Sequence, residues 1–457
     1  MKTANINKFI LQLQGAFDAL GVAVAMPQIE QMAVNVHSAM GTPRRRYHCS
    51  EHALYLCRGM APLQVLAAVF HDVVYYQLDG GFPARVAHYF TPIVSVQGND
   101  LILLRQEPDD QGIQLCLDLF DFAPGQALPL FRGMNEFLSA AVAVRMLEPH
   151  LNAAQMITVL ACIEATIPFR AREADGQDSV SALAARVRTQ ACARMGYQPG
   201  AALEAFVDGV MTAAVTLSNR DVGSFAEPQP GKFLSGTWLL IEESNAPLAA
   251  VGVYTLQDYR EALTRMHNFL EGLQADRIFH HYGQAQGDYD ALVRTASGNL
   301  EFAVEFLRLK ILSITIIEAL ALDSGGNCPV SMFLGDIRAS GGAPERIEDY
   351  LPAGPSGPAL DSRMLDVLEN GRPGDASQDL VVSPLTAYIY RCLGPQGCRD
   401  ALDAGRHMLS GKSSARTFLA SLQPDMLRSI MDACMRIALS RRVALQALRD
   451  SLFAQTH

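Results

Sequence analysis

The amino-acid sequence predicts a mainly α-helical protein with one small β-rich insertion and further helical regions after it. Apolar residues recur at three- and four-residue spacing over most of the chain, which is the pattern of amphipathic helices. Residues 91 to 131 interrupt this pattern with short β-rich runs, separated by spacers that contain Gly, Pro, Asn and Asp. The chain of 457 residues is longer than one hydrophobic core usually serves, so we expect two or three domains.

The predicted elements follow one another in four regions. Residues 5 to 76 contain three or four helices, broken near MGTPRRR and RGMAP. The insertion contributes the runs TPIVSV, DLILLRQ and QLCLDLFDF, and helical spacing then resumes up to about residue 225. We therefore predict a first domain over 1–225 with its β-rich insertion at 91–131, a helical domain over 232–322, a Gly/Pro-rich loop or linker over 323–378, and a C-terminal helical region over 379–457.

Composition narrows the range of partners. The net charge of -10 argues against a broad nucleic-acid surface. Nine cysteines, an odd number without a C-x-x-C pair, indicate reduced thiols. The first residues predict an amphipathic helix and no signal peptide, and the apolar run 309–322 is too short to span a membrane. We expect a cytoplasmic protein without membrane contact, whose C-terminal helices suit a homodimer surface.

Three histidines and an aspartate cluster in the stretch RRRYHCSEHALYLCRGMAPLQVLAAVFHDVVYY. His48 and His52 are four residues apart, which places them on one face of a predicted helix. His71 and Asp72 end the next apolar run, where burial of polar groups is costly unless they find partners. Two imidazoles and a carboxylate suit one divalent ion such as Zn, Mn, Fe or Mg. Histidines satisfied within a packed core are the alternative.

These motifs resemble the HD-domain superfamily of metal-dependent phosphohydrolases. RYHCSEHALYL and LAAVFHDVVY look like the Y-H-x-x-x-H and F-H-D-x-V-Y signatures of one group of predicted HD phosphohydrolases. NEFLSAA (135–141) and IEATIPFR (163–170) are similar to the N-E-x-x-S-A and I-x-x-T segments of that group. The resemblance covers about residues 40–225. Two features depart from it: no histidine follows Thr166, and the insertion separates the His-Asp pair from Asn135 and Glu136.

The resemblance implies a helical HD-like metal-binding domain and a ligand set. Its metal ligands are His48, His71, Asp72 and Asp221, with Asp208 as the competing candidate for the distant aspartate. It implies hydrolysis of a small phosphorylated molecule, such as a nucleotide or phosphate ester, by a metal-activated water. We assign Asp72, His52 and Glu136 to catalysis. Arginine suits phosphate geometry, and the candidates for substrate phosphate are Arg46, Arg170 and Arg220.

Two other functions remain open at this point. A degenerate, non-catalytic HD module would bind a ligand or a protein partner, and the two departures and the unassigned second half of the chain favour it. A di-iron HD-type oxygenase needs additional histidines between the His-Asp pair and the distant aspartate, and only His88 and His150 are available there. The paired histidines of RIFHHYG (278–284) predict packing or surface positions, because adjacent residues diverge on a helix.

Overall fold

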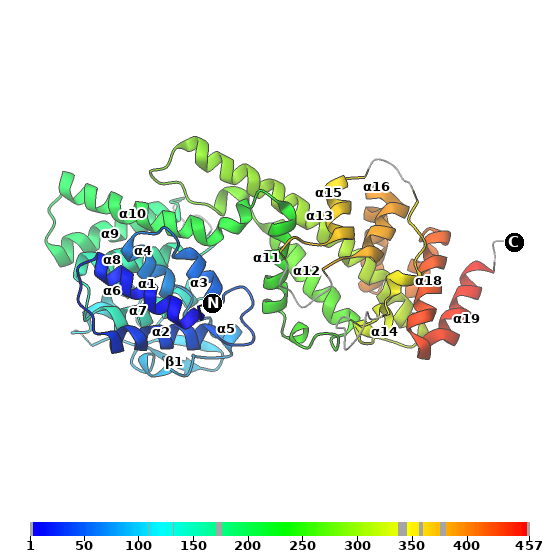
Figure 1. Cartoon of the computed structure of the whole chain (residues 1–457), viewed down its shortest axis with the longest axis horizontal. Coiled ribbons are helices and arrows are strands. Elements are labelled where there is room, and N and C mark those ends of the chain that lie inside the picture. Colours follow the sequence, from blue (N-terminus) through cyan, green and yellow to red (C-terminus); the bar gives the residue numbers. More distant parts are fainter. Residues whose placement is uncertain are drawn as a thin grey trace. The chain divides into compact units, whose positions relative to one another are not determined.

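The computed structural model describes residues 3–107, 109–130, 132–170, 176–336, 345–355, 360–374 and 381–454. It is 68% helical and its described strands form a single two-stranded sheet, which confirms the predicted mainly α class. The chain forms two compact units (Figure 1), the first made of Met1–Ala226 and Gln274–Ala296 and the second of Glu227–Leu273 and Ser297–His457. Residues 274–296, which lie inside the predicted region 232–322, belong to the first unit.

The first unit is built around α8, whose residues from Val159 to Ala165 are all buried. Asn152 caps the start of this helix by accepting a hydrogen bond from the Gln155 amide at 3.0 Å. Around α8 (Ala153–Ala165) pack α4, α6, α7, α9 and α10. The helices of this unit are α1 (Asn5–Ala19), α2 (Met26–Met40), α3 (Ser50–Leu56), α4 (Pro62–Phe70), α5 (Tyr76–Asp79), α6 (Gln111–Phe120), α7 (Met134–Leu147), α9 (Ser179–Met195) and α10 (Ala201–Asp221), with short 3-10 turns at Ala87–Tyr89, Val222–Ala226 and Ala275–Arg277.

The β-rich insertion is smaller than predicted. Strands β1 (Val94–Gln97) and β2 (Asp100–Leu103) pair antiparallel through a two-residue turn, in which Gly98 has a positive φ of 62°. The third predicted β-run, QLCLDLFDF, is instead most of α6. Asp110 caps this helix by accepting from the Ile113 amide. The helix is amphipathic, because Gln111, Gln114 and Asp118 lie on one exposed or half-buried face and the apolar side chains are buried. The alternation of Gln114 and Asp118 with apolar neighbours is what favoured a strand in the sequence.

The second unit is organised along α13 (Gln286–Ser324), a helix of 39 residues that begins in the first unit. The only tryptophan, Trp238, is buried, and the guanidinium carbon of Arg372 lies 4.0 Å from its ring centroid. The remaining elements are α11 (Pro230–Ser244), α12 (Leu256–Gly272), α14 (Val330–Leu334), α15 (Ser362–Asn370), α16 (Pro384–Leu409), α17 (Ala415–Ala420), α18 (Pro424–Ile437) and α19 (Arg442–Phe453), with 3-10 turns at Ala246–Ala249, Ile347–Tyr350 and Leu439–Arg441.

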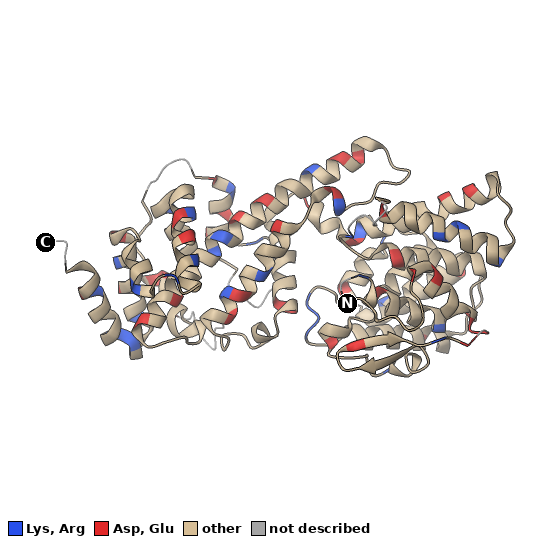
Figure 2. Cartoon of the chain, turned by 180° about the vertical axis from the view of Figure 1, so that it is seen from behind, with Lys and Arg blue, Asp and Glu red and all other residues tan. Residues whose placement is uncertain are grey.

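Several bulk properties can be followed in the structure. Acidic and basic side chains are interspersed along the helices of each unit (Figure 2). None of the nine cysteines forms a disulfide. Among the described helices, the span Ala201–Ala226 is long and apolar enough to cross a membrane, but it also carries the packing of the first unit against α8 and α9. Length and composition therefore give only weak evidence of a membrane span.

Candidate metal centre

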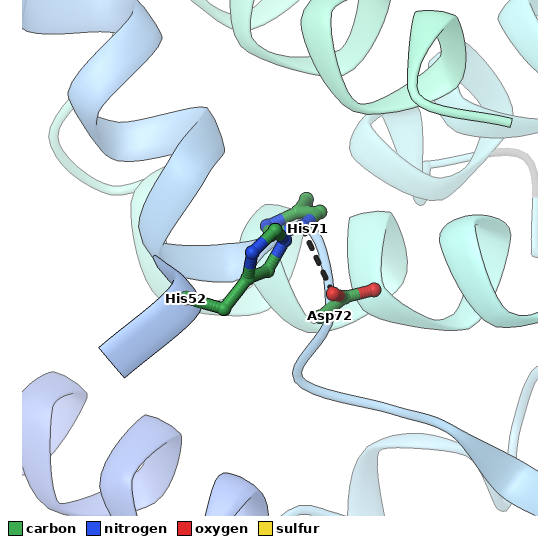
Figure 3. Close-up of side chains that lie close together, drawn as sticks. All are labelled: His52, His71 and Asp72. Atoms are coloured by element: carbon green, nitrogen blue, oxygen red, sulfur yellow. Dashed lines mark ion pairs between the residues drawn. The ribbon is translucent and has the colours of Figure 1, made fainter. Parts of the chain in front are cut away.

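Four polar side chains converge from three helices of the first unit. His52 lies on α3, and His71 is the residue at which α4 ends, with Asp72 directly after it (Figure 3). Asp221 is the last residue of α10. His52 comes from a short helix and Asp221 from the end of a long one. Each side chain therefore reaches the centre without a whole polar helix face being buried there.

The distances between these side chains define a compact group. His52 Nε2 lies 2.8 Å from Asp221 Oδ1, and His71 Nε2 lies 2.9 Å from Asp72 Oδ2 and 3.5 Å from Asp221 Oδ1. Within the described part of the chain, His52, His71 and Asp72 form the one group of three whose ligand atoms all lie within 4.8 Å of one another. A His-His-Asp group of this kind could hold a metal ion.

Two buried atoms of this group, His71 Nε2 and Asp72 Oδ2, face each other and form an ion pair at 2.9 Å that does not meet standard hydrogen-bond geometry. The other ring nitrogen of His71, Nδ1, lies 2.9 Å from the carbonyl oxygen of Ala68 and donates its proton there, so Nε2 is the nitrogen that would bind an ion once its own proton is displaced. Ligand atoms that sit about 2.0–2.2 Å from one ion are roughly 3.0–3.5 Å apart. The residues present therefore fit a divalent ion.

The charges of the group stabilise one another. Burial alone would raise the pKa of Asp72, but the imidazoles of His71, His48 and His52 outweigh it and hold this pKa well below its ordinary value. Asp221 responds in the same way, since hydrogen bonds from His52 and His71 overcome burial and lower its pKa to about 2. Burial would lower the pKa of His71, but Asp72 and Asp221 raise it well above its ordinary value. Both carboxylates are thus ionised at neutral pH.

His48 is placed differently from our expectation. The helix α3 begins at Ser50, after Cys49 in an extended conformation (φ −108°, ψ 176°), so His48 precedes the helix and does not share a face with His52. Its ring lies against Tyr75, with the centroids 4.9 Å apart, and 6.1 Å from the ring of His52. His48 still acts on Asp72 electrostatically. The structure therefore brings His52, and not His48, into the compact group.

Arg45 fixes the backbone that follows α4. Its buried guanidinium donates to the carbonyl oxygens of Asp72 at 2.5 Å and Val73 at 3.1 Å, and it forms an ion pair with Asp79 at 2.5 Å. A charged donor on two successive carbonyls restricts the turn that carries the Asp72 side chain. Arg45 stands between Arg44 and Arg46 in the sequence, and only its buried contacts distinguish it from them.

The first turn of α7 holds the segment after Asp72 from its other side. Ser139 Oγ accepts a hydrogen bond from the Val74 amide, and Asn135 Oδ1 accepts one from the Tyr76 amide, both at 3.0 Å. Glu136, between them on the helix, has a pKa raised to about 7 by burial and by the charges of Asp72 and Asp221, while Arg170 opposes the shift. The NEFLSAA segment is thus a direct neighbour of the His-Asp pair despite the intervening insertion.

Other residues that the sequence analysis named lie outside the compact group. Asp208 is exposed and accepts a hydrogen bond from the Tyr282 hydroxyl at 2.5 Å, so the contact with the histidines belongs to Asp221. Arg220 donates to the carbonyl oxygen of Arg58, and Arg46 lies in the same turn as His48. His88 is exposed beside Tyr89, and His150 packs on Phe17, both outside the compact group.

Sequence reasoning assigned the RIFHHYG histidines to packing or surface positions, and His280 is half-buried in the first unit. Its segment returns to the first unit, where the Asn219 side chain donates to the His280 carbonyl and accepts from the His280 amide, each at 2.8 Å. Burial, with the nearby Arg170, lowers the pKa of this imidazole to about 4. The doublet in RIFHHYG was the visible signal, but its partner Asn219 lies 61 residues away and carries no motif.

Comparison with known proteins adds no family to this description, because no family model, curated protein or solved structure matches the chain. The fold and the site define the class: a mainly α-helical protein whose first unit contains a buried His-His-Asp group able to hold a metal ion. Any activity has to be argued from the chemistry of that group.

Proposed function

We propose that the first unit is a metal-dependent phosphohydrolase of the HD type, acting on a small phosphorylated molecule such as a nucleotide or phosphate ester. The observation that carries the proposal is the buried group of His52, His71 and Asp72, whose ligand atoms all lie within 4.8 Å of one another, with His71 Nε2 and Asp72 Oδ2 2.9 Å apart in an ion pair that does not meet standard hydrogen-bond geometry. Unsatisfied buried polar atoms are costly, and a cation between a neutral imidazole and a carboxylate would satisfy both.

The residues that would hold one divalent ion are His52, His71, Asp72 and Asp221. A divalent ion in such a site supplies Lewis acidity, which polarises a phosphoryl oxygen and makes water a stronger acid. The order of the motif supports the assignment, since a histidine, an adjacent His-Asp pair and a distant aspartate follow one another as in the HD superfamily that the sequence resembles. His48, against Tyr75, would lie behind this ligand set and add its charge to the field at Asp72.

Glu136 is the residue best suited to move a proton. In the protein without a bound ion its pKa is raised to about 7, mainly by burial, so both protonation states are populated near neutral pH, which is the condition for efficient general acid or base catalysis. The charges of Asp72 and Asp221 contribute to that pKa, so Glu136 lies within their electrostatic reach. In the proposed reaction it accepts a proton from the attacking water or donates one to the leaving oxygen.

The test compares metal content and phosphate release in the full chain and in matched variants. Elemental analysis of the purified protein should find about one divalent ion per chain, and a panel of nucleotides and phosphate esters should release phosphate. Asp221→Ala should lose the ion, whereas Asp208→Ala, on the same helix but exposed, should retain it. His52→Ala against His48→Ala identifies the ligand histidine of the first motif, and we expect the larger loss of metal with His52→Ala.

The double variant His71→Ala, Asp72→Ala should lose the ion and all phosphate release while far-UV circular dichroism shows a folded helical protein. Retention of the ion by this variant would place the site elsewhere. A chain that binds the ion but hydrolyses nothing in the panel is a non-catalytic HD module, which contradicts the hydrolase proposal.

A further inference from the structure

Tyr47 directly precedes the first motif histidine and is half-buried beside the metal centre. The Cys49 amide donates to the Tyr47 carbonyl oxygen at 2.9 Å, and α3 begins immediately after Cys49. A hydrogen bond over two residues closes a tight turn, so the backbone of Tyr47 is fixed relative to the helix that carries His52. This turn sends the neighbouring rings of Tyr47 and His48 to different partners.

The ring of Tyr47 packs against the histidine that α3 contributes to the compact group. The ring centroids of Tyr47 and His52 are 5.2 Å apart, with an angle of 37° between the ring planes. A contact between rings uses no hydrogen-bonding atom of His52, whose Nε2 lies 2.8 Å from Asp221 Oδ1. A side chain that is already held in place loses less conformational entropy when it binds. Tyr47 therefore restricts the His52 ring and leaves its nitrogen at the centre.

The hydroxyl of Tyr47 contacts the segment that follows Asp221. Tyr47 Oη lies 3.1 Å from Ser224 Oγ, within hydrogen-bond distance. Ser224 belongs to the 3-10 turn Val222–Ala226, which continues directly from α10 and its last residue, Asp221. The buried ring of Phe225 anchors this turn by apolar packing. The hydrogen bond to Tyr47 adds a directional restraint to the same turn, and through it to the helix end that carries the Asp221 carboxylate.

The segment that carries Asp72 is connected to Tyr47 through His48. The ring of His48 has its centroid 5.0 Å from that of Tyr47 and 4.9 Å from that of Tyr75. Tyr75 lies in the segment after Asp72. Consecutive ring contacts thus run from Tyr75 through His48 and Tyr47 to His52. Tyr47 is the residue at which these ring contacts meet the hydrogen bond to the turn after α10, so it touches the surroundings of ligands on three separate segments.

We propose that Tyr47 is a positioning residue of the metal centre, which holds His52 and the helix end at Asp221 in the relative placement that a bound ion requires. These two ligands are 169 residues apart in the chain and lie on separate helices, so their placement depends on contacts of this kind. The inference rests on the proposed function through the bound ion alone, and it applies whether or not hydrolysis follows. Loss of such a contact changes the affinity for the ion and the geometry of its coordination.

The test measures the affinity of the full chain for Mn²⁺ by calorimetry. Tyr47→Phe keeps the ring contacts and removes only the hydroxyl. Residues that orient metal ligands typically contribute 10–100-fold to metal affinity, so we expect Tyr47→Phe to bind Mn²⁺ about tenfold more weakly than the wild-type chain. Ser224→Ala removes the other end of the same hydrogen bond and should cause a loss of the same size. The double variant should bind Mn²⁺ no more weakly than either single variant, because both substitutions break one interaction.

The matched control is Tyr282→Phe, which removes another tyrosine hydroxyl from the first unit. The Tyr282 hydroxyl donates to Asp208 at 2.5 Å, on the same helix as Asp221 but at an exposed position. This variant should leave the affinity for Mn²⁺ unchanged. Visible absorption of the protein loaded with Co²⁺ reports the geometry of the ligands. The absorption bands should therefore shift in Tyr47→Phe and stay in place in Tyr282→Phe, which a general loss of folding stability would not produce.

An unchanged affinity for Mn²⁺ in Tyr47→Phe would overturn the proposal while leaving the metal centre in place. Additive losses in the double variant with Ser224→Ala, an equal loss in Tyr282→Phe, or unchanged Co²⁺ bands in Tyr47→Phe would overturn it as well. If circular dichroism shows that Tyr47→Phe does not fold, Ser224→Ala carries the same comparison with the wild-type chain. Absence of Mn²⁺ binding in the wild-type chain is a different outcome, since it overturns the proposed function together with this inference.

Discussion

Replacing Arg45 by methionine tests how the turn after α4 is held. The Arg45 side chain is completely buried and that of its partner Asp79 is 4% exposed. The substitution keeps most of the apolar stem but removes the donors to the carbonyl oxygens of Asp72 and Val73 and to the Asp79 carboxylate. Asp79 would retain only longer contacts, from the Thr42 hydroxyl at 3.3 Å and the Tyr75 amide at 3.4 Å.

The expected loss of folding stability in Arg45→Met follows from the burial of the ion pair. Removing one partner of a buried ion pair destabilises a protein by about 3–5 kcal/mol, because the other charge stays buried without compensation. The exposed pair of Arg188 and Glu204, with side chains 42% and 52% exposed, should lose no more than about 1 kcal/mol on Arg188→Met. The carbonyls of Asp72 and Val73 also lose their anchor, so we expect the affinity for a divalent ion to fall by about 10–100-fold in Arg45→Met alone.

The assay is equilibrium unfolding in urea, followed by far-UV circular dichroism and by tryptophan fluorescence. Trp238 is the only tryptophan and belongs to the second unit, so its fluorescence serves as an internal reference for that unit. Circular dichroism follows the helices of both units. We expect Arg45→Met to displace the part of the dichroism transition that has no counterpart in the fluorescence.

A dichroism transition of Arg45→Met that coincides with that of Arg188→Met would refute this reasoning, since it would mean that the buried pair contributes no more than a surface pair. A double-mutant cycle with Asp79→Asn separates the pair from its surroundings. If the coupling energy is near zero, the loss in Arg45→Met comes from the backbone carbonyls, and the ion pair is not what holds the turn.

Three further predictions concern individual residues. The pKa of Glu136 is raised to about 7 in the folded protein, so the stability that its bound proton contributes is complete below about pH 4.5 and is lost as the pH rises through 7. The free energy of unfolding, measured in urea with EDTA, should therefore decline by no more than about 3 kcal/mol between these pH values. Glu136→Gln should remove that decline. The pKa of His280 is lowered to about 4, so stability should instead fall as the pH drops below 6.5, and the His280 ring resonances, assigned with His280→Asn, should not titrate between pH 5.5 and 8. Gly112→Ala should destabilise the protein by about 1–3 kcal/mol in thermal unfolding, because the new Cβ would lie 2.5 Å from Val144 Cγ1. Gly209→Ala, at an exposed position on α10 with open space around it, should instead stabilise the protein by up to about 1 kcal/mol.

Local sequence patterns were sufficient for the fold class and for the centre of the site. The three-to-four-residue spacing of apolar side chains predicted the helices, and the polar pair His71 and Asp72 at the end of an apolar run was visible because it interrupts that spacing. The contact of Asp221 with the histidines was predicted only through the resemblance to HD proteins. Spacing alone does not relate residues 52 and 221, which lie on separate helices.

Other features depend on information that the pattern does not contain. The α6 helix has one polar face of Gln111, Gln114 and Asp118, but Gln114 and Asp118 also alternate with apolar residues, and that period of two was predicted as a strand. Because α3 begins at Ser50, His52 lies on the helix and His48 precedes it, so the two do not share a helix face as predicted. Helix ends are set by a few local hydrogen bonds that the periodicity of the sequence does not report. His280 reaches the first unit by a chain excursion through the second unit, for which no local signal exists.

The surroundings of the His-Asp pair argue for a functional centre in the first unit. Elsewhere in that unit, buried polar side chains hold backbone groups: Arg45 and Ser139 hold the turn after Asp72, and Gln64 donates to the carbonyl oxygen of Ala213. His71 Nε2 and Asp72 Oδ2 hold no backbone group and face each other in an ion pair that does not meet standard hydrogen-bond geometry. A buried polar atom that lacks a good hydrogen bond costs about 1–3 kcal/mol. A purely structural role for the pair has to accept that cost, whereas a cation bound by both atoms would remove it.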